Sequence, residues 1–108
     1  DEYFSLENRI LSREIFDMGV KAMWATGYQG NKNVISARLK ARRKRCKVTQ
    51  QELAARMQVL GVNIDQRSIS KIEHNDRAVT DFELACFCKA LQCTEQDLLQ
   101  DFYENLNE

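Results

Sequence analysis

The chain has 108 residues, with 16 basic and 16 acidic side chains, so its formal net charge at pH 7 is zero. It contains no proline and four glycines, which at this length favours a helical protein with a modest core that needs no staples. No apolar run approaches the roughly 20 residues that span a bilayer, and no secretory leader is recognisable. We therefore expect a cytoplasmic protein without a membrane partner.

The charged residues are segregated along the chain. Between Lys32 and Val48 there are eight basic residues and no acidic one, and from Thr94 onward there are five acidic residues and no basic one. This segregation indicates one surface that faces a polyanion, with the acidic ends directed elsewhere. A solvated helix face is the alternative interpretation of the basic run.

The first 24 residues follow the spacing of a helix of moderate quality. Gly27 and Gly30 end this segment, so residues 1–31 are predicted to be an N-terminal helical arm and linker. Residues 32–108 are predicted to be the main domain. The arm could cover that domain, join a dimer interface or be a foreign leader, and the sequence leaves these alternatives open.

Five helices are predicted in the main domain. They lie at about residues 34–46, from Thr49, at about residues 66–74, from Thr80 and from Thr94. The helix from Thr80 is apolar nearly all round in its central turns, which marks it as the most buried.

Four helix starts repeat one pattern of an apolar residue, a capping oxygen, two free positions, a polar residue and a second apolar residue. The pairs of cap and polar residue are Thr49–Glu52, Thr80–Glu83, Asp65–Ser68 and Thr94–Asp97. The first two pairs are predicted to form full capping boxes, and the other two to form weaker versions. Because each cap contributes on the order of 1 kcal/mol and fixes a helix boundary, the predicted fold class is all-α.

The stretch from Asp65 to His74 has the pattern of a short helix with two different faces. One face carries Ile69, Ile72 and Glu73. The other carries an amide, long cations and a hydroxyl, which are groups that read base edges or bind phosphates in DNA. Its members are Gln66, Arg67, Ser70, Lys71 and His74. We interpret this stretch as a recognition helix, with an ordinary hydrated helix face as the alternative.

Two charged residues fall on apolar stripes. Arg43 shares a stripe with Leu39, and Glu73 shares one with Ile69. A lone charge on a core face is costly, so we predict that Arg43 and Glu73 pair and tie their two helices together. The alternative is that Arg43 extends to solvent with the rest of the basic run.

Four stretches occur in order with nearly regular spacing: Thr49–Ala54, Ile69–Glu73, Val79–Leu84 and Ala90–Leu91. Together they resemble the phage-repressor-like (Cro/Xre) helix-turn-helix family over about residues 33–100. The resemblance implies a lambda-repressor-like domain of five helices that binds double-stranded DNA, as a homodimer on a two-fold symmetric operator. We therefore expect a transcription regulator of prokaryotic or phage type, and a repressor in particular.

The resemblance also implies roles for single residues. Gln66, Arg67 and Lys71 would face base edges, and Gln50 would contact a phosphate or brace the recognition helix. Arg43 and Glu73 stand where the family often has a buried ion pair. From the residue types themselves we expect Ser70 to join the base readers. The remaining phosphate candidates are Lys40, Arg42, Lys44, Lys47, His74 and Arg77.

Two departures from the family pattern affect this interpretation. The joint before the recognition helix, residues 58–64, is about five residues longer than usual. Either the preceding helix runs on to about Leu60, or a loop is pinned by Val59, Leu60 and Val62. In addition, Asn75 replaces a glycine often found after the recognition helix, and Asn is the next best residue for a left-handed helix end.

The four cysteines do not predict a metal site. Cys86 and Cys88 are one residue apart on a predicted helix, so they point about 200° apart and cannot grip one ion. Small core side chains in a reducing compartment are the simpler interpretation. We expect no cofactor and no enzymatic activity, because the sequence shows neither a phosphate-binding loop nor a nucleophile with a histidine partner.

The last helix is the preferred dimer surface, through Leu98, Leu99, Phe102 and Leu106. The N-terminal arm is the second candidate. An alternative function is a protein-interaction module, such as an antitoxin or anti-repressor component, whose acidic termini bind a protein partner.

Overall fold

The computed structural model describes residues 27–106. The chain divides between Asn31 and Lys32 into two compact units. In the first, Tyr28 and Asn31 exchange two backbone hydrogen bonds of 2.9 and 2.8 Å across a tight turn. The helix expected over residues 1–24 lies outside the described residues. Within residues 27–106, no helix has the length and apolar character needed to cross a membrane.

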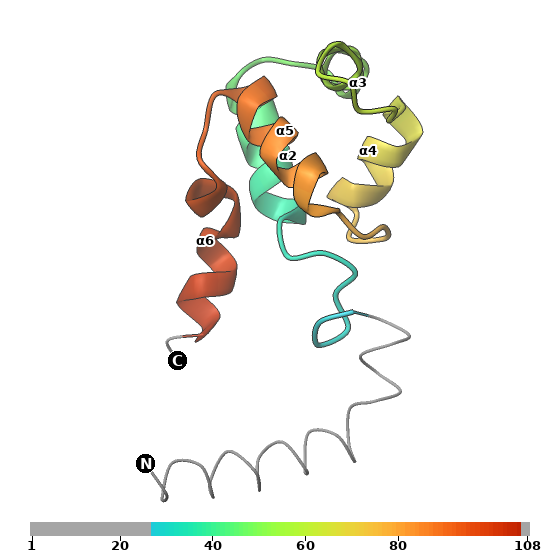
Figure 1. The fold of residues 1–108 in the computed structure, drawn as a ribbon. Coiled ribbons are helices and arrows are strands. Elements are labelled where there is room, and N and C mark those ends of the chain that lie inside the picture. Colours follow the sequence, from blue (N-terminus) through green and yellow to red (C-terminus); the bar gives the residue numbers. More distant parts are fainter. Residues whose placement is uncertain (1–26, 107–108) are drawn as a thin grey trace, which may run out of the picture. The chain divides into compact units, whose positions relative to one another are not determined.

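The second unit is all-α, as predicted, with five helices over its described residues. They are α2 (Ser36–Arg45), α3 (Gln50–Val59), α4 (Gln66–Glu73), α5 (Asp81–Leu91) and α6 (Glu95–Leu106) (Figure 1). α3 and α4 follow one another as a pair, α2 and α5 pack against this pair, and α6 lies against α2 and α5. α4 therefore packs against α2 and α3.

The capping residues begin the helices as predicted, but the predicted ranking of the boxes was wrong in two places. Thr80 and Glu83 form a full capping box. Thr94 and Asp97 also bond reciprocally, at 2.9 and 3.1 Å, because the shorter aspartate still reaches the cap N–H. The carboxylate of Glu52 instead accepts the hydroxyl of Thr49 at 3.2 Å, so that box is only half formed.

Four helices end in the same way, with one residue in the left-handed conformation. Around each of these residues, two backbone bonds close a Schellman motif that satisfies carbonyls at the helix end. The left-handed residues are Lys47, Gly61, Asn75 and Gln92. Three of the four are not glycine, so they hold a backbone conformation that L-residues rarely adopt.

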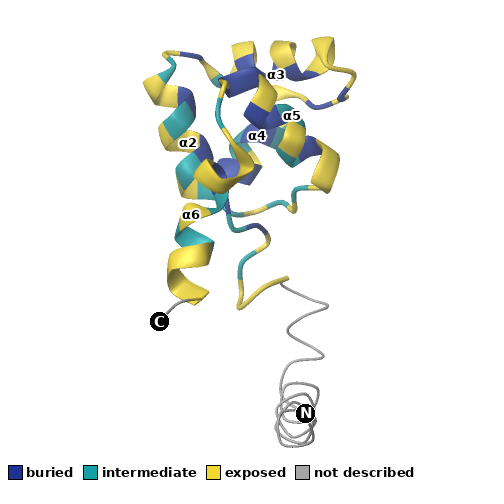
Figure 2. Ribbon diagram, turned by 60° about the vertical axis from the view of Figure 1, so that its left-hand side comes forward, coloured by how far each residue is buried: buried dark blue, intermediate teal, exposed yellow. Residues whose placement is uncertain are grey.

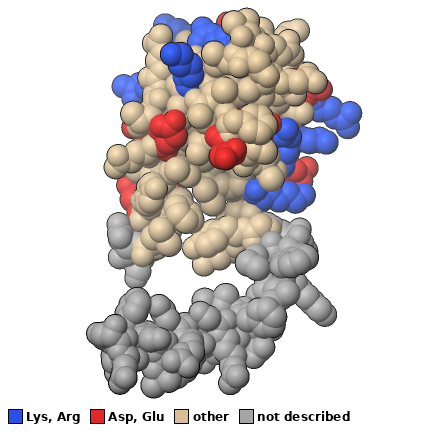
Figure 3. Space-filling view, viewed as in Figure 1, with Lys and Arg blue, Asp and Glu red and all other residues tan. Residues whose placement is uncertain are grey.

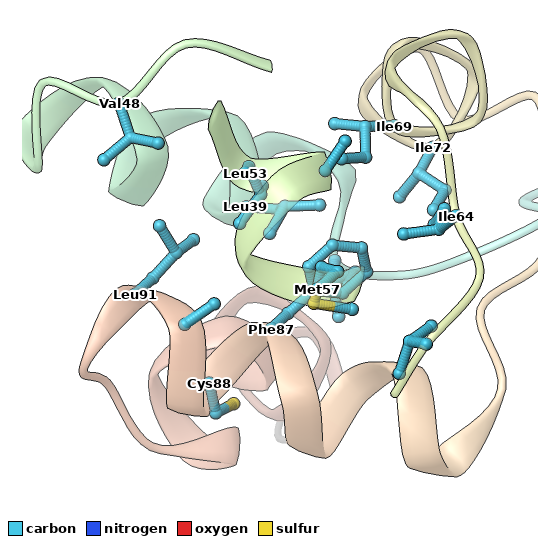
Figure 4. Close-up of a cluster of buried hydrophobic side chains, with 14 of the residues drawn as sticks. Leu39, Val48, Leu53, Met57, Ile64, Ile69, Ile72, Phe87, Cys88 and Leu91 are labelled. Carbon is cyan, nitrogen blue, oxygen red and sulfur yellow. The ribbon is translucent and has the colours of Figure 1, made fainter. Parts of the chain in front are cut away.

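The core lies where α2, α3, α4 and α5 meet, and the buried residues of each helix turn inward while the opposite faces are exposed (Figure 2). Phe87, Leu39, Leu53 and Ile69 are among its fully buried side chains, and they converge in Figure 4. Leu98 is also buried, at 1 % exposure. The prediction that Leu98 forms part of a dimer surface is therefore wrong, because this side chain completes the protein's own core.

The lengthened turn between α3 and α4 combines the two expected alternatives. α3 runs to Val59 and is capped by Leu60, but Val59 is 86 % exposed and pins nothing. Gly61 then reverses the chain with φ +90°, and Val62 and Ile64 enter the core. Two apolar anchors on the far side of the reversal therefore fix where α4 begins.

Candidate nucleic-acid interface

α4 separates apolar and polar side chains sharply. Ile69 and Ile72 are fully buried. Gln66, Arg67 and Lys71 are exposed on the opposite side. Ser70 is half-buried between the two faces. The helix therefore turns an uninterrupted polar face to solvent, and that face contains the side chains suited to reading or binding DNA.

Arg43 of α2 and Glu73 of α4 form a buried, bidentate ion pair. Arg43 Nε donates to Glu73 Oε2 at 2.6 Å, and Arg43 Nη2 donates to Glu73 Oε1 at 3.0 Å. The third nitrogen, Nη1, donates to the carbonyl of Val48 at 2.9 Å. Because all three guanidinium nitrogens donate to partners inside the protein and the residue is buried, Arg43 does not extend to solvent with its cationic neighbours.

The pair stays charged despite its burial. Burial by itself raises the pKa of Glu73, but hydrogen bonds from Arg43 and Gln50 outweigh it and hold the pKa below its ordinary value. The hydrogen bond to Glu73 likewise raises the pKa of Arg43. Both groups are therefore ionised at neutral pH, and their attraction fixes α4 against α2.

Gln50, at the start of α3, connects the ion pair to the polar face of α4. Its Nε2 donates to Glu73 Oε1 at 3.0 Å, and its Oε1 accepts from Gln66 Nε2 at 2.9 Å. Of its two expected roles, the structure shows Gln50 bracing the recognition helix. An open hollow of about 470 Å³ lies beside this bridge, lined by Arg43, Thr49, Gln50, Gln51 and Gln66.

The basic run of α2 divides into structural and exposed cations. Arg38 pairs with Asp101 of α6 at 2.8 Å. Arg42 donates to the carbonyls of Leu91 and Gln92 at 3.1 and 2.8 Å. Arg42 therefore caps the C-terminal end of α5, where a cation also interacts favourably with the helix dipole. Its expected contact with phosphate stays a prediction, for a guanidinium that already has two partners within the protein.

Arg77 is a second phosphate candidate that already has a partner within the protein. Its guanidinium makes a bidentate ion pair with the buried Glu83, at 2.9 and 3.2 Å. Burial works against the charge of Glu83, but Arg77 and the backbone of Thr80 hold the pKa of this carboxyl below its ordinary value. Arg77 thus neutralises the capping box of α5 and is not a free cation.

The other phosphate candidates lie at the surface. Lys40, Lys44 and Lys47 are exposed, and the field of Lys40 acts on Glu73, so Lys40 lies on the α4 side of α2. His74 is exposed, and its Nδ1 donates to the carbonyl of Ser70 at 2.7 Å. Figure 3 shows basic side chains gathered along the edge where α4 lies in Figure 1, with a second group near the ends of α2 and α5.

Asn33 is a structural residue that the sequence patterns did not identify. It is buried, and its Nδ2 donates to the carbonyls of Ile72 and Arg77 at 3.0 and 2.9 Å. Its backbone N–H donates to the side chain of Asn75 at 3.1 Å. Of these two asparagines only Asn75 had a sequence signal, namely its suitability for a left-handed helix end. Asn33 belongs to no periodic stripe, so no local pattern points to it.

The cysteines lie around the end of α5, and all four are free thiols. Cys88 is buried, and this burial raises the pKa of its thiol to about 12. Within residues 27–106, no cluster of histidine, cysteine and carboxylate side chains could hold a metal ion. Cys88 packs as a small apolar side chain in the core, and the other three thiols lie partly buried against it.

Comparison with known proteins identifies the family of the chain. No curated protein and no solved structure matches the chain. The helix-turn-helix family model HTH_3 matches residues 39–98, which include α3, the lengthened turn, α4 and α5. Members of this family are DNA-binding transcription regulators. Because the match covers more than half of the chain, the protein belongs to the phage-repressor-like (Cro/C1-type) helix-turn-helix family.

Proposed function

We propose that the protein is a sequence-specific regulator that binds double-stranded DNA through α4 and acts as a repressor. The observation that carries this proposal is the ordered polar face of α4, in which Glu73 holds Gln50 and Gln50 holds Gln66. A side chain that is already held loses less conformational freedom when DNA binds. Repression requires only that an operator be occupied, which suits a compact DNA-binding unit.

Gln66 is prepared to read adenine. Its Nε2 uses one N–H on Gln50, which leaves one N–H and the carbonyl oxygen for a ligand. Adenine presents an acceptor, N7, beside a donor, N6, in the major groove, and this pair matches a glutamine amide. Gln66 would therefore approach adenine with its amide plane fixed.

Cations surround this amide on the same helix. Arg67 matches the two acceptors of guanine, and Lys71 and Ser70 supply further donors one turn later. Lys40, Lys44, Lys47 and His74 are proposed to contact phosphates beside the groove, where they would set affinity without reading sequence. Base reading and phosphate binding would thus come from different elements.

A dimer is proposed to form through the apolar end of α6. Tyr103 and Leu106 are 48 % and 55 % exposed, and Leu99 and Phe102 are half-buried beside them. A two-fold dimer would place two copies of α4 in successive major grooves, about 34 Å apart. Its operator would then be a palindrome with half-sites one helical turn apart.

Selection from random duplex DNA, followed by mobility shifts across a salt series, tests DNA binding. The wild type is expected to enrich a palindrome and to lose affinity steeply as salt rises. Gln66→Ala should relax the preference for one base pair in each half-site, by about 1–3 kcal/mol of discrimination. Lys40→Ala should instead weaken binding to all sequences and lower the log–log salt slope by about 0.9.

Gln96→Ala is the matched control, because Gln96 is exposed on α6, away from the polar face of α4. It should bind as the wild type does. Absence of a shift at any salt concentration, on random or selected DNA, would refute DNA binding and favour a protein-interaction module. Equal weakening by Gln66→Ala on every sequence would exclude base reading by that residue.

Sedimentation equilibrium tests the dimer surface. Leu106→Asp should shift the protein toward monomer, because it places a charge on the apolar end of α6. Val59→Asp, at a residue that is 86 % exposed elsewhere on the protein, is the control and should leave the mass unchanged. A dimer that persists in Leu106→Asp would place the interface on another surface.

A further inference from the structure

The segment before α2 is fastened to the C-terminal end of α4 by a group of hydrogen bonds, which we call the asparagine clasp (Asn33 and Asn75 with their partners). Asn75 Oδ1 accepts the backbone N–H groups of Lys32 and Asn33 at 3.0 and 3.1 Å. In return, Asn33 Nδ2 donates to the carbonyls of Ile72 and Arg77. The contact thus joins residues that are 39 to 44 positions apart in the sequence.

Asn33 is fully used within the clasp. Its amide nitrogen makes both of its bonds to the clasp carbonyls, and its Oδ1 accepts the N–H of Ile35 at 3.1 Å. The bond to Ile72 is buried, and the carbonyl it satisfies is one that a helix end leaves without a full set of partners. A side chain of another length or charge would leave part of this set unsatisfied.

The hydrogen bonds of Asn75 explain why this position, where the family often has glycine, holds an asparagine. Its φ of +58° is left-handed, a conformation that glycine would adopt more readily. Glycine, however, would supply no acceptor for the two N–H groups of Lys32 and Asn33. The asparagine therefore combines a tolerable left-handed turn with a side-chain function that glycine lacks.

The clasp completes the support of α4. At its N-terminal end the helix is capped by Asp65 and bridged through Gln66 to Gln50. At its other end Glu73 pairs with Arg43, and the clasp binds the backbone carbonyl of Ile72 in the last turn. A helix of eight residues has too few internal bonds to resist tilting by itself, so both ends need external partners.

We propose that Asn33 is a positioning residue for base reading, which rests on the proposed DNA-binding function. Asn33 is buried and offers no free donor to DNA, so it acts through the orientation of α4. Loss of the clasp would let the last turn of α4 move and would misalign Gln66 and Lys71 with base edges. Phosphate contacts tolerate such movement better, because they depend on charge more than on angle.

The experiment compares Asn33→Ala, Asn33→Asp and Asn75→Gly with the wild type, at a temperature where circular dichroism shows each variant fully folded. Asn33→Asp keeps the oxygen that accepts from Ile35 but sets a carboxylate oxygen against the two clasp carbonyls, so it should disrupt the clasp at least as strongly as Asn33→Ala. Asn75→Gly keeps the left-handed turn and removes the acceptor of the two N–H groups. Asn63→Ala, at an exposed asparagine in the turn before α4, is the matched control.

Two quantities are measured for each variant. The first is the ratio of affinities for the selected operator and for random duplex DNA, which should fall about tenfold in Asn33→Ala while random-DNA affinity and the salt slope stay unchanged. The second is amide hydrogen exchange of the free protein at His74, Asn75 and Asp76, which should accelerate in the three clasp variants. Asn63→Ala should change neither quantity.

The outcomes separate the two proposals. Unchanged exchange in Asn33→Ala would refute the clasp as a support of α4, whether or not DNA is bound. Faster exchange with an unchanged affinity ratio, or a parallel loss of both affinities, would refute its role in base reading. Failure of the wild type to bind either DNA would refute the proposed function, and the exchange rates would still judge the clasp.

Discussion

Single residues in this protein carry structural tasks that their type alone would not predict. Arg43 lies among seven other basic residues between Lys32 and Val48, yet it is the one buried against Glu73. Three of its five N–H groups donate to two carboxylate oxygens and a carbonyl, which a lysine ammonium could not match in this planar geometry. Gln50 also donates to this carboxylate, so Glu73 connects the core to the polar face of α4.

A double-mutant cycle tests the ion pair. Arg43→Met and Glu73→Leu should each lower the free energy of unfolding by about 3–5 kcal/mol, because each leaves the opposite charge buried alone. The double variant should lose less than the sum of the two. Urea unfolding at pH 7 measures all four forms, with the exposed neighbour Lys44→Met as control. Additive losses would mean that the two side chains do not stabilise one another.

At the scale of elements, the helix ends contain residues in a strained backbone conformation. Four helices close with left-handed residues, and Lys47, Asn75 and Gln92 do so without being glycine. A non-glycine residue in this conformation costs roughly 1–2 kcal/mol, less for asparagine, whose short polar side chain bonds locally. Asn75 repays this cost through the asparagine clasp, whereas the side chain of Gln92 is exposed.

Glycine substitutions at two helix ends should therefore act in opposite directions. Gln92→Gly should raise the free energy of unfolding by about 0.5–1 kcal/mol, since relief of the left-handed strain exceeds the added entropy of the unfolded chain. Asn75→Gly should lower it, because two backbone N–H groups lose their acceptor. Urea unfolding of both variants at pH 7 decides, and a stabilising Asn75→Gly would contradict the importance given to the clasp.

For the whole molecule, we expect acidic pH to lower the free energy of unfolding. The pKa values of Glu73 and Glu83 both lie below their ordinary value of 4.5 in the folded protein, because hydrogen bonds from arginines outweigh burial. The unfolded chain therefore takes up protons at higher pH than the folded one. The resulting stabilisation is complete above about pH 4.5 and is lost as the pH falls further through the folded-state pKa values.

Urea unfolding between pH 3 and pH 7 measures this dependence. The free energy of unfolding should be level at the upper end and should fall steeply below about pH 4.5. Glu83→Gln should flatten part of this fall, whereas the exposed Glu104→Gln should leave it as in the wild type. A free energy that stays constant down to pH 3 would show that the buried carboxylates do not govern acid stability.

The sequence by itself determined the helix starts, the faces of the helices and the pairing of Arg43 with Glu73. The starts and faces follow from spacings of three or four residues, which are local properties of the chain. The pairing spans 30 positions, and it was predicted because each inward charge needs a partner and these two fall on apolar stripes. The ranking of the capping boxes failed because it depends on which hydrogen a carboxylate meets, and sequence spacing does not specify that.

Only the tertiary structure decided which polar residues stay free for a partner. Arg42 is used by carbonyls 49 and 50 positions away, Asn33 holds a helix end 39 positions away, and Leu98 is enclosed by other helices. No repeat or spacing near these residues records such contacts, because the contacts exist only once distant segments have packed. The sequence thus determined the helices and the polar face of α4, and packing decided which cations are engaged within the protein and which are exposed.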